Sequence, residues 1–267
     1  MIDRKRKMPL TIFFLSIPLL IISQEFRKIE DPPFQRGEYG RYRVFYDSWL
    51  TSGLTAGVGT ISIREENKKF HGRDTYHIEV IAKSVGLFNW FFKVRDVYES
   101  WVDTEGIMPW YFYRNQEEGS YTKEESVEIN QAENWAESEK EKIDVPPYVQ
   151  DIVSAFYYMR TLDFSDACPQ DEYFINFVMD DSVYHSKIIF LGKEIVKTKM
   201  GKFRCLKFKP MVAEGAVFDE PYPMTLWVTD DVNHVPVLGK SAVIVGSITL
   251  ELTDIKGLKY PMDALLE

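Results

Sequence analysis

The chain has 267 residues, of which 45% are hydrophobic and 15% aromatic, and it carries a formal net charge of −9 at pH 7. This length and apolar content are ample for a packed core. Basic residues do not gather into a cluster able to hold a phosphate backbone, which excludes nucleic acid as an expected partner. The acidic balance also argues against an anionic membrane surface.

Residues 1–23 have the layout of a secretory signal peptide. The basic residues Arg4–Lys7 precede an apolar run, Met8–Ile22, and Ser23 suits the position before a cleavage site. The run is shorter than the ~20 residues of a straight transmembrane helix, which favours cleavage over the alternative, an uncleaved anchor. Cleavage removes four bases and one acid, which moves the net charge from −9 to −12. We therefore predict an exported single β-rich domain, residues 24–267, with no stable membrane span.

Alternation of apolar and polar residues predicts β-strands along most of the mature chain. In Thr75–Lys83, for example, apolar residues occupy every second position from Tyr76 to Ala82, as a half-buried antiparallel strand requires. The polar stretch 114–146 is expected to form twisted edge strands. Further strands are expected at residues 42–46, 57–63, 97–103, 110–114, 173–179, 183–191, 203–210, 224–229 and 242–252. Roughly a dozen strands with short turns indicate one large antiparallel sheet.

Two segments depart from the strand pattern. Gly86–Val94 concentrates aromatic residues, and two interpretations stay open: packing in the core, as aromatic clusters usually do, or a lip that contacts a ligand. Between residues 148 and 161, Val149, Val153 and Phe156 recur at three- and four-residue intervals, which predicts an amphipathic helix. We expect this helix to pack on the concave side of a strongly curved sheet or half-open barrel.

Several segments together resemble an exported bacterial family catalogued as domain of unknown function 3108. The resemblance spans nearly all of the mature chain and is carried by Phe34–Tyr46, Phe92–Ser100, Asp151–Arg160, Leu191–Glu194 and Trp227–Asp231. It implies a mostly antiparallel β fold and the envelope of a Gram-negative bacterium, and it implies no activity. By a looser analogy, the architecture is similar to the half-open barrels of periplasmic lipoprotein carriers, but fold analogy does not establish function.

The sequence carries no signal for a metal, a cofactor or nucleophilic catalysis. The four histidines, His71, His77, His185 and His234, include no pair four residues apart, so a helical zinc pair is excluded. Neither a Gly-x-Ser-x-Gly elbow nor a phosphate-binding glycine loop occurs. We therefore expect no catalytic residue, no cofactor and no metal.

Three acids, Asp96, Glu99 and Asp151, lie among apolar residues and admit two interpretations. Two of them could act as the paired carboxylates of a carbohydrate-acting hydrolase, which must lie about 5 to 9.5 Å apart. Alternatively, Arg95 and Arg160 could form buried ion pairs with them that tie the helix to the sheet. The structural interpretation is favoured, because ion-pair networks also perturb pKa values.

The two cysteines, Cys168 and Cys205, allow a disulfide in an oxidising compartment or two separate thiols. The sequence does not decide between these states.

We expect an exported envelope protein that binds an apolar or amphipathic component without catalysing a reaction. Its partner would be a lipid, a glycolipid or an envelope protein in the periplasm of a Gram-negative bacterium, with membrane attachment if residues 1–23 are retained. The alternative function is the carbohydrate-acting hydrolase. The residues expected to line a binding groove are Trp90, Phe91, Phe92, Trp101, Trp110, Phe156 and Tyr157.

Overall fold

The computed structural model describes residues 25–47, 53–211, 224–242 and 246–266, so the predicted signal peptide lies outside the described residues. Two helices occur in these ranges, α1 (Phe88–Phe91) and α2 (Ser154–Arg160), and neither has the length and apolar character needed to cross a membrane. The strands are β1 (Tyr39–Asp47), β2 (Leu54–Ile63), β3 (Lys69–Phe70), β4 (Arg73–Ser84), β5 (Arg95–Asp103), β6 (Pro109–Glu118), β7 (Tyr121–Asn130), β8 (Trp135–Ser138), β9 (Lys142–Asp144), β10 (Glu172–Met179), β11 (Ser182–Thr198), β12 (Gly201–Pro210), β13 (Met224–Thr229), β14 (Pro236–Ala242), β15 (Ser247–Lys256) and β16 (Leu265–Leu266).

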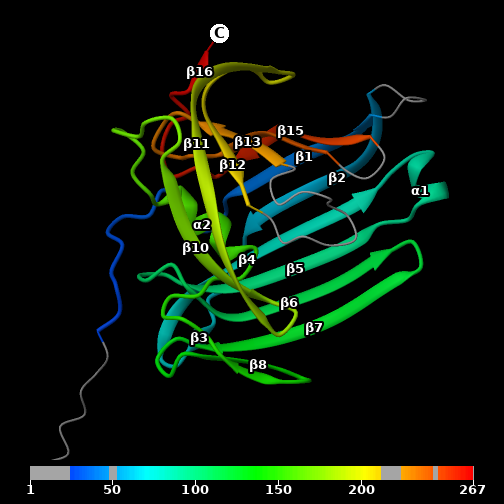
Figure 1. The fold of residues 1–267 in the computed structure, drawn as a ribbon. Helices are drawn as coiled ribbons and strands as arrows, with labels where there is room; N and C mark the ends of the chain where they lie inside the picture. Colours follow the sequence, from blue (N-terminus) through cyan, green and yellow to red (C-terminus); the bar gives the residue numbers. More distant parts are fainter. Residues whose placement is uncertain (1–24, 48–52, 212–223, 243–245, 267) are drawn as a thin grey trace, which may run out of the picture.

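The strands form one antiparallel sheet that curves around a helix without closing (Figure 1). Its strand order is β10-β11-β12-β13-β14-β15-β1-β2-β4-β5-β6-β7-β8-β9, and β3 and β16 pair with β4 and β12. Neighbours in the sheet are mostly neighbours in the sequence, except that β1 pairs with β15. This arrangement confirms the predicted mainly β, half-open barrel architecture.

Local sequence accounts for strand faces and turns. In β4, Ile78 is fully buried while Tyr76 and Val80 pack against the same hydrophobic cluster, so the predicted alternating face does point inward. The turn between β10 and β11 places Asp180 and Asp181 at φ 52° and 53°. Positive φ at both central residues is the requirement of a two-residue type I′ hairpin, and it explains two consecutive aspartates there.

Helix α2 lies on the concave side of the sheet, but it is shorter than the predicted span of 148–161. Tyr148 follows two prolines and has a φ of 59°, and Gln150 forms a parallel bridge with Phe177 of β10, so the chain becomes helical only at Ser154. Tyr157 of α2 belongs to the hydrophobic cluster under β2–β9, whereas Met159 belongs to the cluster under β10–β13. The helix therefore joins the two halves of the sheet.

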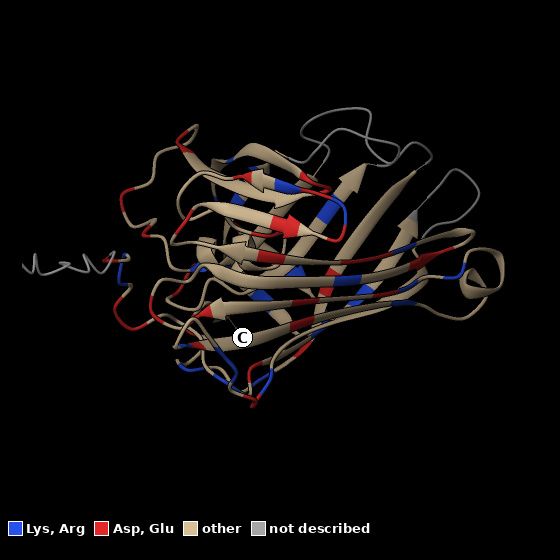
Figure 2. Ribbon diagram, turned by 90° about the horizontal axis from the view of Figure 1, so that it is seen from below, with Lys and Arg blue, Asp and Glu red and all other residues tan. Residues whose placement is uncertain are grey.

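The tip of the β10–β11 hairpin lies against β6 and β7. The Asp180 carboxylate forms ion pairs with Arg114 and Lys123, and Arg114 also pairs with Glu125 at 2.6 Å. Acidic and basic residues both occur along the strands of the sheet (Figure 2). This ion cluster joins the β10–β11 end of the strand order to β6 and β7 without a continuous ladder of hydrogen bonds.

Candidate functional site

The residues expected to line a groove lie in separate places. Trp90 and Phe91 are 79% and 75% exposed in α1, and Phe92 follows them at 45%. Trp110 and Tyr157 are buried at 1% and 0%. Trp101 and Phe156 are half-buried. The Trp101 ring stacks on His77, and Phe156 packs against the hydrophobic cluster under β10–β13. The expected set is therefore not one surface, and its exposed part is the α1 segment.

The acids considered for glycoside chemistry do not meet. Asp96 points to the concave side, whereas Glu99 lies on the opposite face of β5 and hydrogen-bonds to His77 Nε2 at 2.9 Å. Burial, together with the neighbouring Glu118 carboxyl, raises the pKa of Asp96 to about 6. Asp151 is fully buried before α2. The described residues thus hold these acids in separate environments without a shared cleft.

Asp151 connects the helix to the sheet through hydrogen bonds. Its Oδ2 accepts a hydrogen bond from the Ser100 hydroxyl at 2.5 Å, and its Oδ1 accepts the backbone N–H groups of Val153 and Ser154 at 2.7 Å. Burial raises the pKa of Asp151 to about 6. The expected ion pair between Asp151 and an arginine is therefore replaced by neutral donors that hold the start of α2.

Arg160 does form a buried ion pair, but with a partner that the sequence did not indicate. Its guanidinium contacts the Glu38 carboxylate at 2.5 and 3.0 Å, and both side chains are 3% exposed. Its Nε also donates to the carbonyl oxygen of Asn233 at 2.9 Å. Arg95 is exposed instead. The Arg160–Glu38 pair therefore connects the helix to the residue just before β1, and not to β5.

The two cysteines are separate thiols in the structure. Cys205 is buried in β12 and packs with Phe203 and Trp227, while Cys168 is exposed in the loop before β10. Ala167, which precedes Cys168 in the sequence, packs against the hydrophobic cluster on the other face of β12. This cluster includes Leu206. Because adjacent strand residues point to opposite faces, the Cys205 thiol is directed away from the Cys168 loop.

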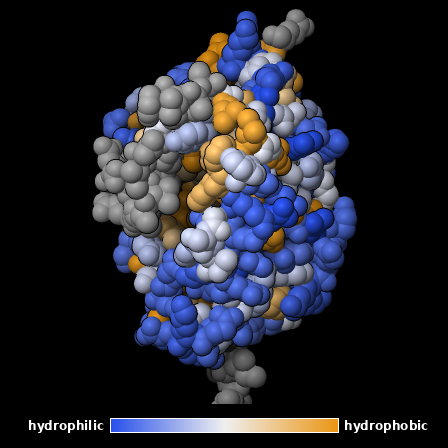
Figure 3. Space-filling view, turned by 90° about the vertical axis from the view of Figure 1, so that its right-hand side faces the viewer, coloured by the Kyte–Doolittle hydropathy of each residue, from blue (hydrophilic) through white to orange (hydrophobic). Residues whose placement is uncertain are grey.

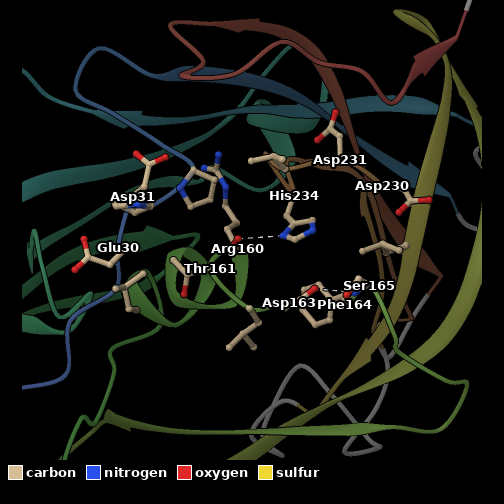
Figure 4. A pocket seen from close by; sticks show the side chains of 16 residues that line it. Glu30, Asp31, Arg160, Thr161, Asp163, Phe164, Ser165, Asp230, Asp231 and His234 are labelled. Carbon is tan, nitrogen blue, oxygen red and sulfur yellow. Dashed lines mark hydrogen bonds between the residues drawn. The ribbon is translucent and has the colours of Figure 1, made fainter.

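A pocket of about 410 Å³ opens beside the carboxyl end of α2 (Figure 4). Segments far apart in the sequence form it: Ile29–Pro33 before β1, Arg160–Ser165 at the end of α2, and Asp230–Val232 with His234 between β13 and β14. Its apolar walls are Ile29, Pro33, Leu162, Phe164, Leu206 and Val232. The helix positions one wall because the Arg160–Glu38 pair fixes its carboxyl end.

His234 supplies a polar group to this pocket. Its Nδ1 donates a hydrogen bond to the carbonyl oxygen of Arg160 at 3.0 Å, and the Phe164 ring lies edge-on at 5.1 Å. Burial lowers the pKa of His234 below its usual 6.5, so the ring is neutral at pH 7. With Nδ1 protonated, Nε2 carries a lone pair and accepts hydrogen bonds.

Apart from Arg160, the remaining polar lining of the pocket consists of Thr161, Ser165 and five acidic residues. Its carboxylates are those of Glu30, Asp31, Asp163, Asp230 and Asp231. Hydrogen bonds from Lys259 and Tyr260 lower the pKa of Asp31, and the backbone N–H of Ser165 lowers that of Asp163. The only arginine in the lining, Arg160, is already paired with Glu38. The pocket therefore presents acceptors and offers no free cation.

No group of three or more metal-binding side chains occurs in the part of the chain that the structure describes. Four pocket residues stand out in the sequence: His234 among the scattered histidines, Arg160 as an ion-pair candidate, and Asp230 and Asp231 in a segment of the family resemblance. No periodicity or spacing marks the others, because three distant segments meet only in the folded chain.

The fold defines a β-barrel-like protein whose open antiparallel sheet wraps around one helix. The chain belongs to the family described as Protein of unknown function (DUF3108), whose model matches residues 41–253. This match confirms the resemblance noted in the sequence. No curated protein matches the chain.

Solved structures support the fold. A β-barrel-like protein of domain of unknown function DUF1849 from Brucella abortus has a TM-score of 0.54 and 11% identity, covering 84% of this chain and 98% of that chain. A candidate lipoprotein from Parabacteroides distasonis has a TM-score of 0.36 and 11% identity over 87% and 100% of the two chains. A candidate exported protein with a YmcC-like fold from Bacteroides fragilis has a TM-score of 0.33 and 12% identity over 84% and 97%. The likeness to the Brucella structure concerns the fold alone.

Proposed function

We propose that this is an exported envelope protein that binds a small amphipathic molecule in the pocket beside α2 and performs no catalysis on it. The observation that carries the proposal is the pocket itself, whose apolar walls end at the His234 ring and a set of carboxylates. The N-terminal pattern of residues 1–23 supports export. The burial of Asp96 and Asp151, and the position of Glu99 on the other face of β5, favour binding over a paired-carboxylate hydrolase.

The size and lining of the pocket suit a ligand with an apolar body. Ligand pockets usually enclose about 300 to 1,000 Å³ and combine apolar walls with a few polar groups. This pocket has about 410 Å³, and Phe164 and Leu206 are buried in its floor. Asp31 and His234 in its lining have left-handed backbones, with φ of 53° and 44°. Such conformations cost free energy and are concentrated at functional sites.

The charges of the pocket select the polar head of the ligand. Carboxylates at the rim repel an anionic head. Lys259 and Lys193 pair with Asp31 and Asp230, and Arg160 pairs with Glu38, so no cation of the described lining is left to attract such a head. His234 Nε2 accepts a hydrogen bond from an N–H or O–H group. The ligand is therefore an amphipathic molecule with an ammonium or a neutral hydroxylated head, and not a fatty acid.

The test compares probes that share a twelve-carbon chain and differ in the head: dodecylamine, dodecyl maltoside and dodecanoate. Calorimetric titration below the micelle concentration should show binding of the amine and the maltoside, and none of the carboxylate. Val232→Lys places a cation at the pocket in a side chain that is 59% exposed, and it should abolish amine binding. The matched control Ile195→Lys alters a residue that is 65% exposed in β11, outside the pocket lining, and should leave binding unchanged.

The pH dependence provides an independent check. Protonation of His234 below its lowered pKa adds a positive charge to the pocket and removes the Nε2 acceptor. Amine binding should therefore weaken as the pH falls below 6.5 and through the lowered pKa of His234, and His234→Gln should remove that dependence. Equal binding of dodecanoate and dodecylamine, or full binding by Val232→Lys, contradicts the proposal.

A further inference from the structure

The connection between β4 and β5 exposes an apolar surface at one end of the molecule. We call Leu87, Trp90, Phe91 and Phe92 the apolar lip, and their exposed fractions are 71%, 79%, 75% and 45%. Helix α1 buries none of its residues, and it projects beyond the ends of the strands (Figure 1). Apolar surface gathers on this end of the molecule within a largely hydrophilic surround (Figure 3). Contiguous exposed apolar surface of this kind marks an interaction site.

The lip is held in place by the residues at its base. The Ser84 hydroxyl donates to Asn89 Oδ1 at 2.8 Å and accepts the backbone N–H of Val94 at 2.8 Å. On the inner side of α1, the Phe88 ring packs against Tyr46 at 5.7 Å. These contacts use one side of the segment and leave Leu87, Trp90 and Phe91 directed outward.

Basic residues lie directly beside the lip. Lys83 and Arg95 are opposite each other in the β4–β5 ladder, both are exposed, and neither forms an ion pair within the described ranges. Lys93 lies between them in the sequence and forms an ion pair with Glu117 at 2.8 Å. Lys93 lowers the pKa of the Glu117 carboxyl, and Arg95 lowers it to a smaller extent. Glu118, bridged through its backbone to Val94, adds a second acid, so three bases face two acids and the local balance is +1, although the whole chain is acidic.

Aromatic side chains beside cations are the composition of membrane-interface segments. Trp and Phe occupy the headgroup level of a bilayer, and nearby Lys and Arg bind the lipid phosphates. The net charge of the chain argues against an anionic surface, but charges further away than a Debye length of about 8 Å are largely screened. We propose that the apolar lip docks this protein on a lipid bilayer that contains anionic headgroups, with Lys83 and Arg95 at the phosphates.

This inference is independent of the pocket, since no residue of the lip or its basic neighbours lines it. The test uses residues 24–267, which contain every residue of the hydrophobic clusters and lack the apolar run of the predicted signal peptide. Flotation is measured with vesicles of phosphatidylcholine alone and with about 30% phosphatidylglycerol added. The protein should float with the mixed vesicles and much less with phosphatidylcholine alone.

Two matched pairs of variants separate the apolar and the ionic contributions. The triple variant Leu87→Ser/Trp90→Ser/Phe91→Ser should lower vesicle binding by about tenfold or more, because its apolar insertion is lost. Phe174→Ser alters a side chain that is 73% exposed in β10 and should leave binding unchanged.

Lys83→Glu/Arg95→Glu should reduce the preference for mixed vesicles by about tenfold. Lys197→Glu/Lys202→Glu makes the same charge change at another exposed cross-strand pair, in β11 and β12, and should have a much smaller effect. Absence of flotation with mixed vesicles, or equal flotation of the triple variant and the parent, overturns the proposal. A change of oligomeric state in the triple variant without vesicle binding would instead assign the lip to a second copy of the chain.

Discussion

The buried Arg160–Glu38 pair allows a quantitative test of how α2 is held. Glu38→Gln keeps the shape of the side chain but leaves the guanidinium against a neutral amide in a site where both residues are 3% exposed. Breaking a buried ion pair by removing one partner costs about 3 to 5 kcal/mol, because the remaining charge is unpaired. At about 2 to 4 °C per kcal/mol for a domain of this size, the melting temperature should fall by roughly 6 to 20 °C.

Urea denaturation of the parent and the variant measures this loss directly. The control is Glu137→Gln, which removes a carboxylate from the exposed Lys142–Glu137 pair, where the side chains are 50% and 51% exposed. Surface pairs contribute about 0 to 1 kcal/mol, so the control should be nearly neutral. Glu38→Met combined with Arg160→Met should recover a large part of the stability, since no charge then stays buried. A loss for Glu38→Gln within 1 kcal/mol of the control, by the same scale, refutes the reasoning.

Two further predictions concern buried titratable groups. Because burial raises the pKa of Asp151 to about 6, the protonated form is favoured by folding, and stability present at pH 4 is lost as the pH rises through about 6. Asp151→Asn should remove a stability change of about 3 kcal/mol between pH 4 and pH 8, and an unchanged pH profile would contradict this assignment. Burial also raises the pKa of the Cys205 thiol to about 12, whereas Cys168 is exposed. Iodoacetamide should therefore label Cys168 alone in the native protein and both thiols after unfolding; no labelling without reductant would instead indicate a disulfide.

The strands were predictable because their cause is local. Every second residue of β4 from Tyr76 faces the core, and this face follows from the alternation of a pleated strand alone. The turn at Asp180 and Asp181 has an equally local cause, since short polar side chains tolerate positive φ. The periodicity of apolar residues predicts helix α2 but not its first residue. The helix begins only at Ser154, because the bridge from Gln150 to β10 competes with helix formation.

Features that depend on distant segments were not predictable. Glu38 lies 122 residues from Arg160, and no local pattern connects the two. The sequence around Trp90 is compatible with a buried position in the core or with an exposed lip. Its side chain is exposed because α1 projects beyond the ends of the strands (Figure 1). Trp110, in contrast, is covered by Phe26 from the segment before β1 and by His71. Aromatic content alone does not distinguish these two outcomes.

The pairing of β1 with β15 has a consequence for the order in which the molecule can fold. The ladder joins residues that are 208 positions apart, as in the contact between Arg43 and Glu251. Until β15 is available, one edge of β1 has no partner and the two halves of the sheet are not joined. Such long-range pairing is slow to form. A nascent chain of this protein would therefore keep the two halves of its sheet apart until β15 has been synthesised.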